Sequence, residues 1–305
     1  MSEDVIGQVR SFNRTVTQRI GALQEEYLAR GRPLGASRLL WEVPGSGADV
    51  RRLRARLGLD SGYLSRLLRR LEAEGLVVVE ADPGDRRVRV ARLTEAGRLE
   101  RAELDRLSDD VARSLLAPLD GAEQARLVEA MTAVQRLLTA GMVEIRVEDP
   151  RSEAARFCLQ SYFAELNSRF DGGFDPAAGA SADPQELTRP AGLLLVARLG
   201  GDPIGCGALK FDRGRPVDAG QPVGPAELKR LWVSPSARGL GLGRRLLGAL
   251  EQHARASGVS VVRLDTNRVL REAITLYRST GYAEVPAYND QPYAHLWFGK
   301  KLDPG

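Results

Sequence analysis

A run of alternating glycines, Arg238-Gly239-Leu240-Gly241-Leu242-Gly243, constrains the fold of this chain more than any other feature. It follows a strand-like segment at 227–233 and precedes a helix-like segment at 244–250. Glycines between a strand and a helix let several backbone N–H groups converge on one point, where the helix N-terminus adds partial positive charge. The run therefore predicts a pyrophosphate site, although tight strand-to-helix turns also use glycine for structural reasons alone.

A second block lies downstream, where Leu264-Asp265-Thr266-Asn267 is followed by a helix-like segment ending in Tyr277-x-x-x-Gly281-Tyr282. Together with the pattern Arg238-x-x-Gly241-x-Gly243, this block resembles GNAT-type N-acetyltransferases over roughly residues 142–302. The resemblance implies an α/β GNAT fold with a central mixed β-sheet, and it implies acetyl-CoA as the acyl donor.

The resemblance also implies site residues. Glu227, at the start of the strand before the glycines, is the candidate general base, and Tyr277 is the candidate general acid beside the sulfur. A solvated carboxylate and a packed aromatic side chain are the alternatives, and Asn267 could equally cap the following helix. The implied cofactor contacts are Leu231, Trp232, Val233, Arg238, Gly239, Leu240, Gly241, Leu242, Gly243, Arg244, Asn267 and Tyr277.

The acceptor is expected to be a small-molecule primary amine, with a protein amine as the alternative, because the segments near the acceptor are typical of a closed pocket. Direct attack is expected, because neither Cys158 nor Cys206 lies in a recognisable nucleophile setting. An amphipathic helix at 152–167 and an irregular segment at 170–176 are expected near the acceptor. The candidate substrate residues are Tyr162, Phe170, Phe174, Tyr288, Asn289 and His295.

The first 140 residues carry a different pattern. A short helix is predicted over 49–57, followed by a Gly58-Leu59-Asp60 turn and a second helix from Ser61. On the second helix, leucines at 64, 67, 68 and 71 recur at helical spacing and must pack inward. A polar and basic face remains outside, which is typical of a helix-turn-helix.

A β-hairpin is predicted next, with strands at 76–80 and 88–94 around an Asp82-Pro83-Gly84-Asp85 turn. Its tip carries Arg86 and Arg87, as a wing would. The helix, the wing and the exit Leu93-Thr94-Glu95-x-Gly97 together resemble MarR-family regulators over roughly residues 10–140. We therefore expect a mostly α winged helix-turn-helix with a two-stranded wing.

Charge supports double-stranded DNA as a partner, since residues 51–70 hold seven arginines against one acid, Asp60. An arginine-rich solvated helix is the alternative. The candidate contacts to base edges or phosphates are Ser61, Ser65, Arg66, Arg69, Arg70, Arg86 and Arg87.

Two apolar stripes are candidates for a homodimer interface, with intrachain packing as the alternative. One comprises Leu104, Leu107, Val111 and Leu115, and the other Leu127, Met131, Val134 and Leu138. The MarR resemblance favours pairing of terminal helices across a two-fold axis, and a dimer matches a palindromic operator.

The length of 305 residues suits two domains, predicted over 1–140 and 141–305. Two cysteines and two histidines without ligand spacing predict no metal site. The sequence shows no signal peptide and no apolar run of about 18 residues, so a cytoplasmic location without membrane partners is expected.

The sequence thus predicts a DNA-binding transcriptional regulator fused to an acetyl-CoA-dependent N-acetyltransferase. Two rival hypotheses remain. In one, the C-terminal domain binds acetyl-CoA or an amine as a non-catalytic sensor. In the other, the winged helix serves only for dimerisation.

Overall fold

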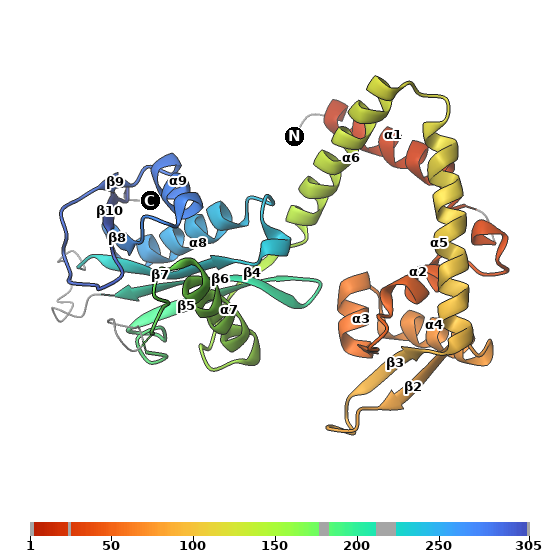
Figure 1. Ribbon diagram of the computed structural model, residues 1–305, viewed down its shortest axis with the longest axis horizontal. Helices are drawn as coiled ribbons and strands as arrows, with labels where there is room; N and C mark the ends of the chain where they lie inside the picture. The colour runs from red at the N-terminus through yellow and green to blue at the C-terminus, as the bar shows by residue number, and fades with distance from the viewer. Residues whose placement is uncertain (1–2, 24–25, 177–182, 212–223, 304–305) are drawn as a thin grey trace. The chain divides into compact units, whose positions relative to one another are not determined.

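The computed structural model describes residues 3–23, 26–176, 183–211 and 224–303. The chain divides into two compact units, Met1–Ala133 and Val134–Gly305, and the boundary falls inside helix α6. Each unit has its own hydrophobic core. Figure 1 labels the elements of both units.

The N-terminal unit is mostly helical. Its helices are α1 (Glu3–Arg19), the 3₁₀ turn η1 (Tyr27–Ala29), α2 (Leu34–Glu42), α3 (Val50–Leu57), α4 (Ser61–Ala73), α5 (Glu95–Leu116) and α6 (Gly121–Gly141). The Asp49 side chain caps α3 by accepting from the N–H of Arg51, and Asp60 caps α4 by accepting from that of Tyr63. Gly58 ends α3 at φ 63°, in the left-handed region that favours glycine. The predicted helix-turn-helix is confirmed.

The wing is the hairpin of β2 (Val77–Ala81) and β3 (Arg89–Leu93). At its turn, the Asp82 carboxylate accepts from the N–H groups of Gly84 and Asp85 at 2.8 and 3.2 Å. A short strand β1 (Ala48–Asp49) pairs with β3, so the sheet order is β1-β3-β2. The sequence predicts the two strands of the wing but misses β1, whose two residues are too few to show a period.

The four inward leucines of α4 pack in the core of this unit with side chains from α2, β2 and β3. Leu104 of α5 belongs to the same core and is fully buried, which corrects its prediction as an interface residue. Leu107, Val111 and Leu115 are half-buried, as are Leu127 and Val134 of α6. Met131 and Leu138 are exposed. The stripe on α5 therefore divides between core and surface.

An ion-pair cluster ties η1 and its following loop to α5. The Glu100 carboxylate, 9% exposed, accepts from Nε of Arg30 at 2.9 Å and from Nη1 of Arg32 at 2.6 Å. Hydrogen bonding to Arg30 is the largest influence, and it helps to lower the pKa of Glu100 from 4.5 to about 2. Glu100 is therefore ionised in the folded N-terminal unit at neutral pH, where it pairs with both arginines.

The C-terminal unit is built on a mixed sheet of strand order β4-β5-β6-β7-β8-β10-β9. The strands are β4 (Glu144–Glu148), β5 (Gly192–Leu199), β6 (Asp202–Phe211), β7 (Ala226–Val233), β8 (Val261–Thr266), β9 (Ala283–Glu284) and β10 (Leu296–Lys301). Neighbouring strands are antiparallel except for the parallel pair β7 and β8. The predicted mixed sheet is confirmed.

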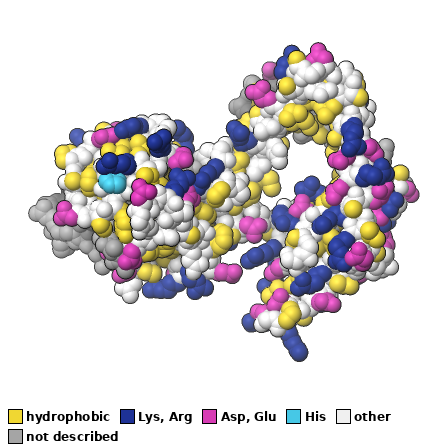
Figure 2. Space-filling model, in the orientation of Figure 1, with side chains coloured by type: hydrophobic (Ala, Val, Ile, Leu, Met, Phe, Trp, Pro, Cys, Tyr) yellow, Lys and Arg dark blue, Asp and Glu magenta, His cyan; other side chains and the backbone are white. Residues whose placement is uncertain are grey.

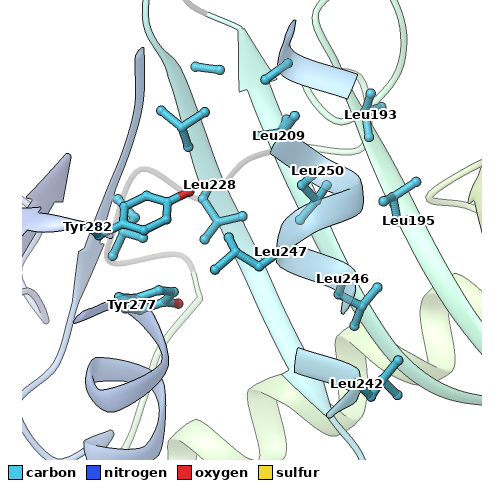
Figure 3. Close-up of a cluster of buried hydrophobic side chains, with 14 of the residues drawn as sticks. Leu193, Leu195, Leu209, Leu228, Leu242, Leu246, Leu247, Leu250, Tyr277 and Tyr282 are labelled. Carbon is cyan, nitrogen blue, oxygen red and sulfur yellow. The ribbon is translucent and has the colours of Figure 1, made fainter. Parts of the chain in front are cut away.

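Helices cover both faces of this sheet. The side chains of the buried strand β5 point alternately to the two faces, so each face has its own core. Leu193 and Leu195 pack in one core with α8 (Leu242–Ala256) and α9 (Arg271–Ser279). Leu194 and Val196 pack in another with α7 (Glu153–Arg169). Figure 3 shows the leucines of α8 lying over β5, β6 and β7, with Tyr277 and Tyr282 beside them.

Among the described residues, no helix combines the length and the apolar composition that crossing a bilayer requires.

We expect Glu100→Gln to destabilise the N-terminal unit by roughly 3 kcal/mol at pH 7, since the pKa falls from 4.5 to about 2 and each unit of pKa difference corresponds to about 1.4 kcal/mol. The lowered pKa makes this contribution complete above pH 4.5, and it is lost as the pH falls toward 2. The measurement is urea denaturation of both chains at several pH values, with hydrogen exchange in α5 assigning the transition.

Glu103→Gln is the matched control on the same helix, because Glu103 forms a more exposed pair with Arg106. Equal destabilisation by both substitutions, or an effect of Glu100→Gln that persists unchanged at pH 2, would contradict the assignment.

Candidate functional site

The predicted anion site lies between β7 and α8. After β7 the chain makes a 3₁₀ turn, η2 (Pro235–Ala237), and α8 begins at Leu242. Gly239 has φ 81° and Gly241, the N-cap of α8, has φ 70°, so both occupy the left-handed region. The first N–H groups of a helix have no intrahelical partner, which leaves those of α8 available to an anion.

A groove of about 560 Å³ adjoins this turn. It is lined by most of the predicted cofactor residues, namely Leu231, Trp232, Val233, Arg238, Gly239, Gly241, Leu242, Gly243 and Arg244. Leu240 does not line it and packs instead against the core of the unit. The opposite wall comes from α7 and α9, through residues such as Tyr162, Glu165 and Leu276.

Glu165 of α7 is a groove residue that the sequence analysis misses. Its carboxylate accepts from Nη2 of Arg238 at 2.6 Å and from Nε1 of Trp232 at 2.9 Å. It also pairs with Arg169 at 3.0 Å. In the sequence Glu165 is one polar residue of an amphipathic helix, and only tertiary folding brings it to Arg238.

Strands β7 and β8 separate beyond their first residues. They pair only at Ala226 with Val262 and at Glu227 with Arg263, whereas β7 stays paired with β6 as far as Val233. Arg230, at φ 59°, lies where the β6–β7 register shifts. The later part of β7 therefore has one edge that is not paired with β8.

A smaller cavity of about 130 Å³ lies at this separation. It shares Tyr162, Leu166, Leu231, Leu270 and Ala273 with the groove, so the two adjoin. Tyr277, of α9, lines the smaller cavity and is 6% exposed. Burial raises the pKa of Tyr277 above its ordinary value of 10.0. The phenol therefore keeps its proton at neutral pH, as a proton donor must.

Glu227 lies apart from Tyr277. It lines a third cavity, of about 390 Å³, together with Lys210 and Arg263. Its carboxylate is 3.3 Å from Nη2 of Arg263 and 3.3 Å from Nζ of Lys229. Lys229 in turn lines the smaller cavity and lies 2.7 Å from Asp265. Lys229 therefore connects Glu227 to the cavity that Tyr277 lines, and Glu227 itself does not line that cavity.

Asn267 is buried and engaged within the chain. Its Nδ2 donates to the carbonyl of Tyr293 at 2.8 Å, and its Oδ1 accepts from the N–H of Val269 at 3.1 Å. These bonds fix the turn after β8, and the residue contributes to the wall of the smaller cavity but not of the groove.

The predicted substrate residues separate into two groups. Tyr162, Phe170 and Phe174 line the smaller cavity. Tyr288, Asn289 and His295 do not. The guanidinium carbon of Arg263 lies 4.3 Å from the ring centroid of Tyr288, and Nδ1 of the exposed His295 accepts from the N–H of Arg268. Nδ2 of Asn289 donates to Oδ1 of Asp265 at 3.3 Å. Asp265 lines the smaller cavity, and the sequence alone does not predict a role for it.

The candidate DNA contacts all lie on the surface of the N-terminal unit. Ser61, Ser65, Arg66, Arg69 and Arg70 are exposed on α4, and Arg86 and Arg87 are exposed at the wing tip. Basic side chains mark that tip in Figure 2.

Intrachain bonds distinguish the arginines of α4. Arg70 is hydrogen-bonded within the chain, because its Nε donates to Glu74 at 3.0 Å and its Nη2 donates to the carbonyl of Gly31 at 2.8 Å. Arg66 instead lies over the ring of Tyr63, at 5.7 Å from the centroid.

Residues 159–282 match the Acetyltransferase (GNAT) family, and residues 31–88 match the MarR family. An IAA acetyltransferase of Azospirillum brasilense is 39% identical over 143 residues, which are 47% of this chain and 85% of that protein. The chain belongs to the GNAT acetyltransferase family. It carries an N-terminal MarR-family domain fused to the GNAT domain, and GNAT membership implies an acyl-CoA donor.

One further relative and one solved structure each align with one part of the chain. The N-alpha-acetyltransferase RimI of Mycobacterium tuberculosis is 33% identical over 123 residues, which are 40% of this chain and 71% of that protein. A MarR-family transcriptional regulator of Rhodococcus sp. RHA1 aligns in three dimensions with 23% identity and a TM-score of 0.36, over 44% of this chain and 96% of that chain.

We expect Gly241→Ala to weaken CoA binding at least about tenfold, because a side chain is strained at φ 70° and the backbone that presents the first N–H groups of α8 would shift. Gly258→Ala is the control, since Gly258 also has a positive φ, 77°, but lies beyond the other end of α8. Isothermal titration calorimetry with CoA measures both. Equal affinity of the two variants would contradict the placement of the pyrophosphate.

Proposed function

We propose that this GNAT–MarR fusion is a DNA-binding transcriptional regulator that also transfers acetyl from acetyl-CoA to a small-molecule primary amine. The observation that carries the catalytic part is the separation of β7 from β8, which joins the glycine-flanked groove to a cavity lined by Tyr277.

The groove suits the donor in shape and charge. In the proposal, the amides at the start of α8 hold the pyrophosphate, with Arg238 and Arg244 supplying positive charge. The apolar side chains of Leu231 and Val233 lie along the pantetheine arm. The β7 edge left unpaired beyond Glu227 offers backbone N–H groups to the acetyl carbonyl.

Direct transfer requires two bond changes and two proton transfers. The neutral amine forms a C–N bond to the acetyl carbon, the C–S bond breaks, and the thiolate leaves. Tyr277 donates its proton to the departing sulfur. Glu227 does not line the cavity, so in the proposal it accepts the proton that the amine loses through an intervening water. The raised pKa of Tyr277 keeps the donor protonated, and Lys229 lies between Glu227 and the cavity.

We expect Tyr277→Phe to reduce kcat about 10²-fold or more with little effect on CoA affinity, because the ring packing remains and only the proton donor is lost. Glu227→Gln is expected to reduce kcat/KM by a similar factor at pH 7. Its activity should recover relative to the wild type as the pH rises, because solvent hydroxide then accepts the proton that the amine loses during transfer. Thiol release from acetyl-CoA measures both variants.

Tight CoA binding by the wild type with no turnover of any amine would instead favour a non-catalytic sensor. A Glu227→Gln variant with a wild-type pH profile would remove Glu227 as the base.

The regulatory part of the proposal rests on the N-terminal unit. We propose that α4 and the wing contact double-stranded DNA, through the exposed residues described above. The apolar faces of α1 and α6 support a homodimer on a palindromic operator, because α1 and α6 contain no buried residue in the single chain. Hydrophobic side chains gather over these helices in Figure 2. They include Val5, Val9, Phe12, Val128, Met131, Leu137 and Leu138.

We expect Arg66→Ala to weaken binding to the DNA upstream of the protein's own gene by about 1–3 kcal/mol, and to reduce the salt dependence by about one phosphate contact. Arg151→Ala removes the same charge from an exposed position in the C-terminal unit and is the matched control. An electrophoretic shift at several salt concentrations measures both. No shift by the wild type at low salt would leave the winged helix as a dimerisation module only.

A further inference from the structure

An aromatic wall lines the smaller cavity. It joins the end of α7, the segment after it and the segment before β10. The ring of Phe174 lies 4.9 Å from that of Tyr293 and 5.7 Å from that of Phe170, and it stacks on Phe163 at 5.9 Å. Phe170, Phe174 and Tyr293 are half-buried and face the cavity as lining residues.

Hydrogen bonds hold this wall in place. The N–H of Phe174 donates to Oδ1 of Asn167 at 3.0 Å, and the N–H of Asp175 donates to the Tyr293 hydroxyl at 3.0 Å. The Tyr293 carbonyl is in turn held by Asn267. These bonds hold the backbone at Phe174 and the side chain of Tyr293, so the rings form a fixed part of the cavity wall.

Asp265, on β8, supplies a carboxylate to the same cavity. Its Oδ1 accepts from Nζ of Lys229 at 2.7 Å and from Nδ2 of Asn289 at 3.3 Å. Asn289 is itself oriented by Nε1 of Trp297, at 2.8 Å. Both donors converge on Oδ1, and within the described ranges no hydrogen bond reaches Oδ2. A carboxylate oxygen of this kind accepts further N–H donors, such as those of an ammonium group.

The size and the remaining charge of the cavity narrow the choice of acceptor. Its volume of about 130 Å³ is close to that of a cavity of about 150 Å³ known to hold one benzene ring. The guanidinium of Arg230 also lines the cavity, 4.4 Å from the ring centroid of Phe163. Lys229 also lines the cavity, so two positive charges stand there against the one carboxylate of Asp265, and this disfavours diamines and polyamines, which would bring a second ammonium.

We propose that the acceptor is an arylalkyl primary amine, whose ammonium group binds Asp265 while its ring lies against Phe170, Phe174 and Tyr293. This inference rests on the proposed acetyl transfer and names its substrate class. Asp265 binds the amine as it enters, and Glu227 keeps its separate role in accepting the proton.

The first test compares amines at equal acetyl-CoA, by thiol release from the full chain. We expect kcat/KM for 2-phenylethylamine to exceed that for n-hexylamine by about three- to tenfold, as aromatic contacts typically allow. It should exceed that for putrescine by more. If phenylalanine is turned over at a comparable rate, the acceptor is an aromatic amino acid. If phenylalanine is rejected, the acceptor is an arylalkyl amine without a carboxylate. Faster turnover of putrescine or of a short peptide would overturn the proposal.

The second test uses variants. Phe174→Leu should raise KM for 2-phenylethylamine and remove its advantage over n-hexylamine. Phe157→Leu is the matched control, because Phe157 is 49% exposed on α7 and does not line the cavity. Asp265→Asn should weaken binding of 2-phenylethylamine about tenfold but leave binding of uncharged 2-phenylethanol unchanged. Equal weakening of both ligands would assign Asp265 a merely structural role and overturn its part in the proposal.

Calorimetry on the CoA-loaded protein separates failure of the inference from failure of the proposed function. Binding of 2-phenylethylamine without turnover of any amine would retain the inferred site and reject catalysis. Turnover of other amines without binding of 2-phenylethylamine would retain catalysis and reject the inferred acceptor.

Discussion

The incomplete pairing of β7 with β8 is the constraint on which the catalytic unit depends. Two residue pairs hold the strands together, and beyond Glu227 only β6 remains paired with β7. The bond between Lys229 and Asp265 spans the two strands just after their pairing ends. The groove and the smaller cavity meet beyond that bond. In our account this one departure from a regular sheet supplies both the donor site and the acceptor site.

The energetic cost of the opening is offset by the packing around it. Leu228, Leu247 and Tyr277 belong to the same core, so α8 and α9 hold the two strands on one face (Figure 3). On the other face Trp232 packs with α7 and donates to Glu165. These contacts keep the unpaired edge of β7 in a rigid setting, which is what a site for a developing negative charge requires.

Local patterns in the sequence predict the parts of this molecule that local rules govern. The period of the leucines in α4 and the turn residues of the wing place this helix and the two strands of the hairpin within about one residue of those observed. Nine residues that line the anion groove follow from the glycine run and the GNAT resemblance. The Glu165–Arg238 pair and the Asp265 network do not, because their members come from segments far apart in the chain. The prediction of Leu104 as an interface residue is wrong for the same reason. An apolar stripe on a helix does not show whether the surface it packs against belongs to the same chain or to a second copy.

The measurement that tests the central claim most directly is a crystal structure of the full chain with acetyl-CoA. The account predicts pyrophosphate density on the amides of residues 239–243 and the thioester between β7 and β8, within reach of the Tyr277 hydroxyl. An acetyl group outside the opening between these strands, or a pyrophosphate bound away from the start of α8, would contradict it.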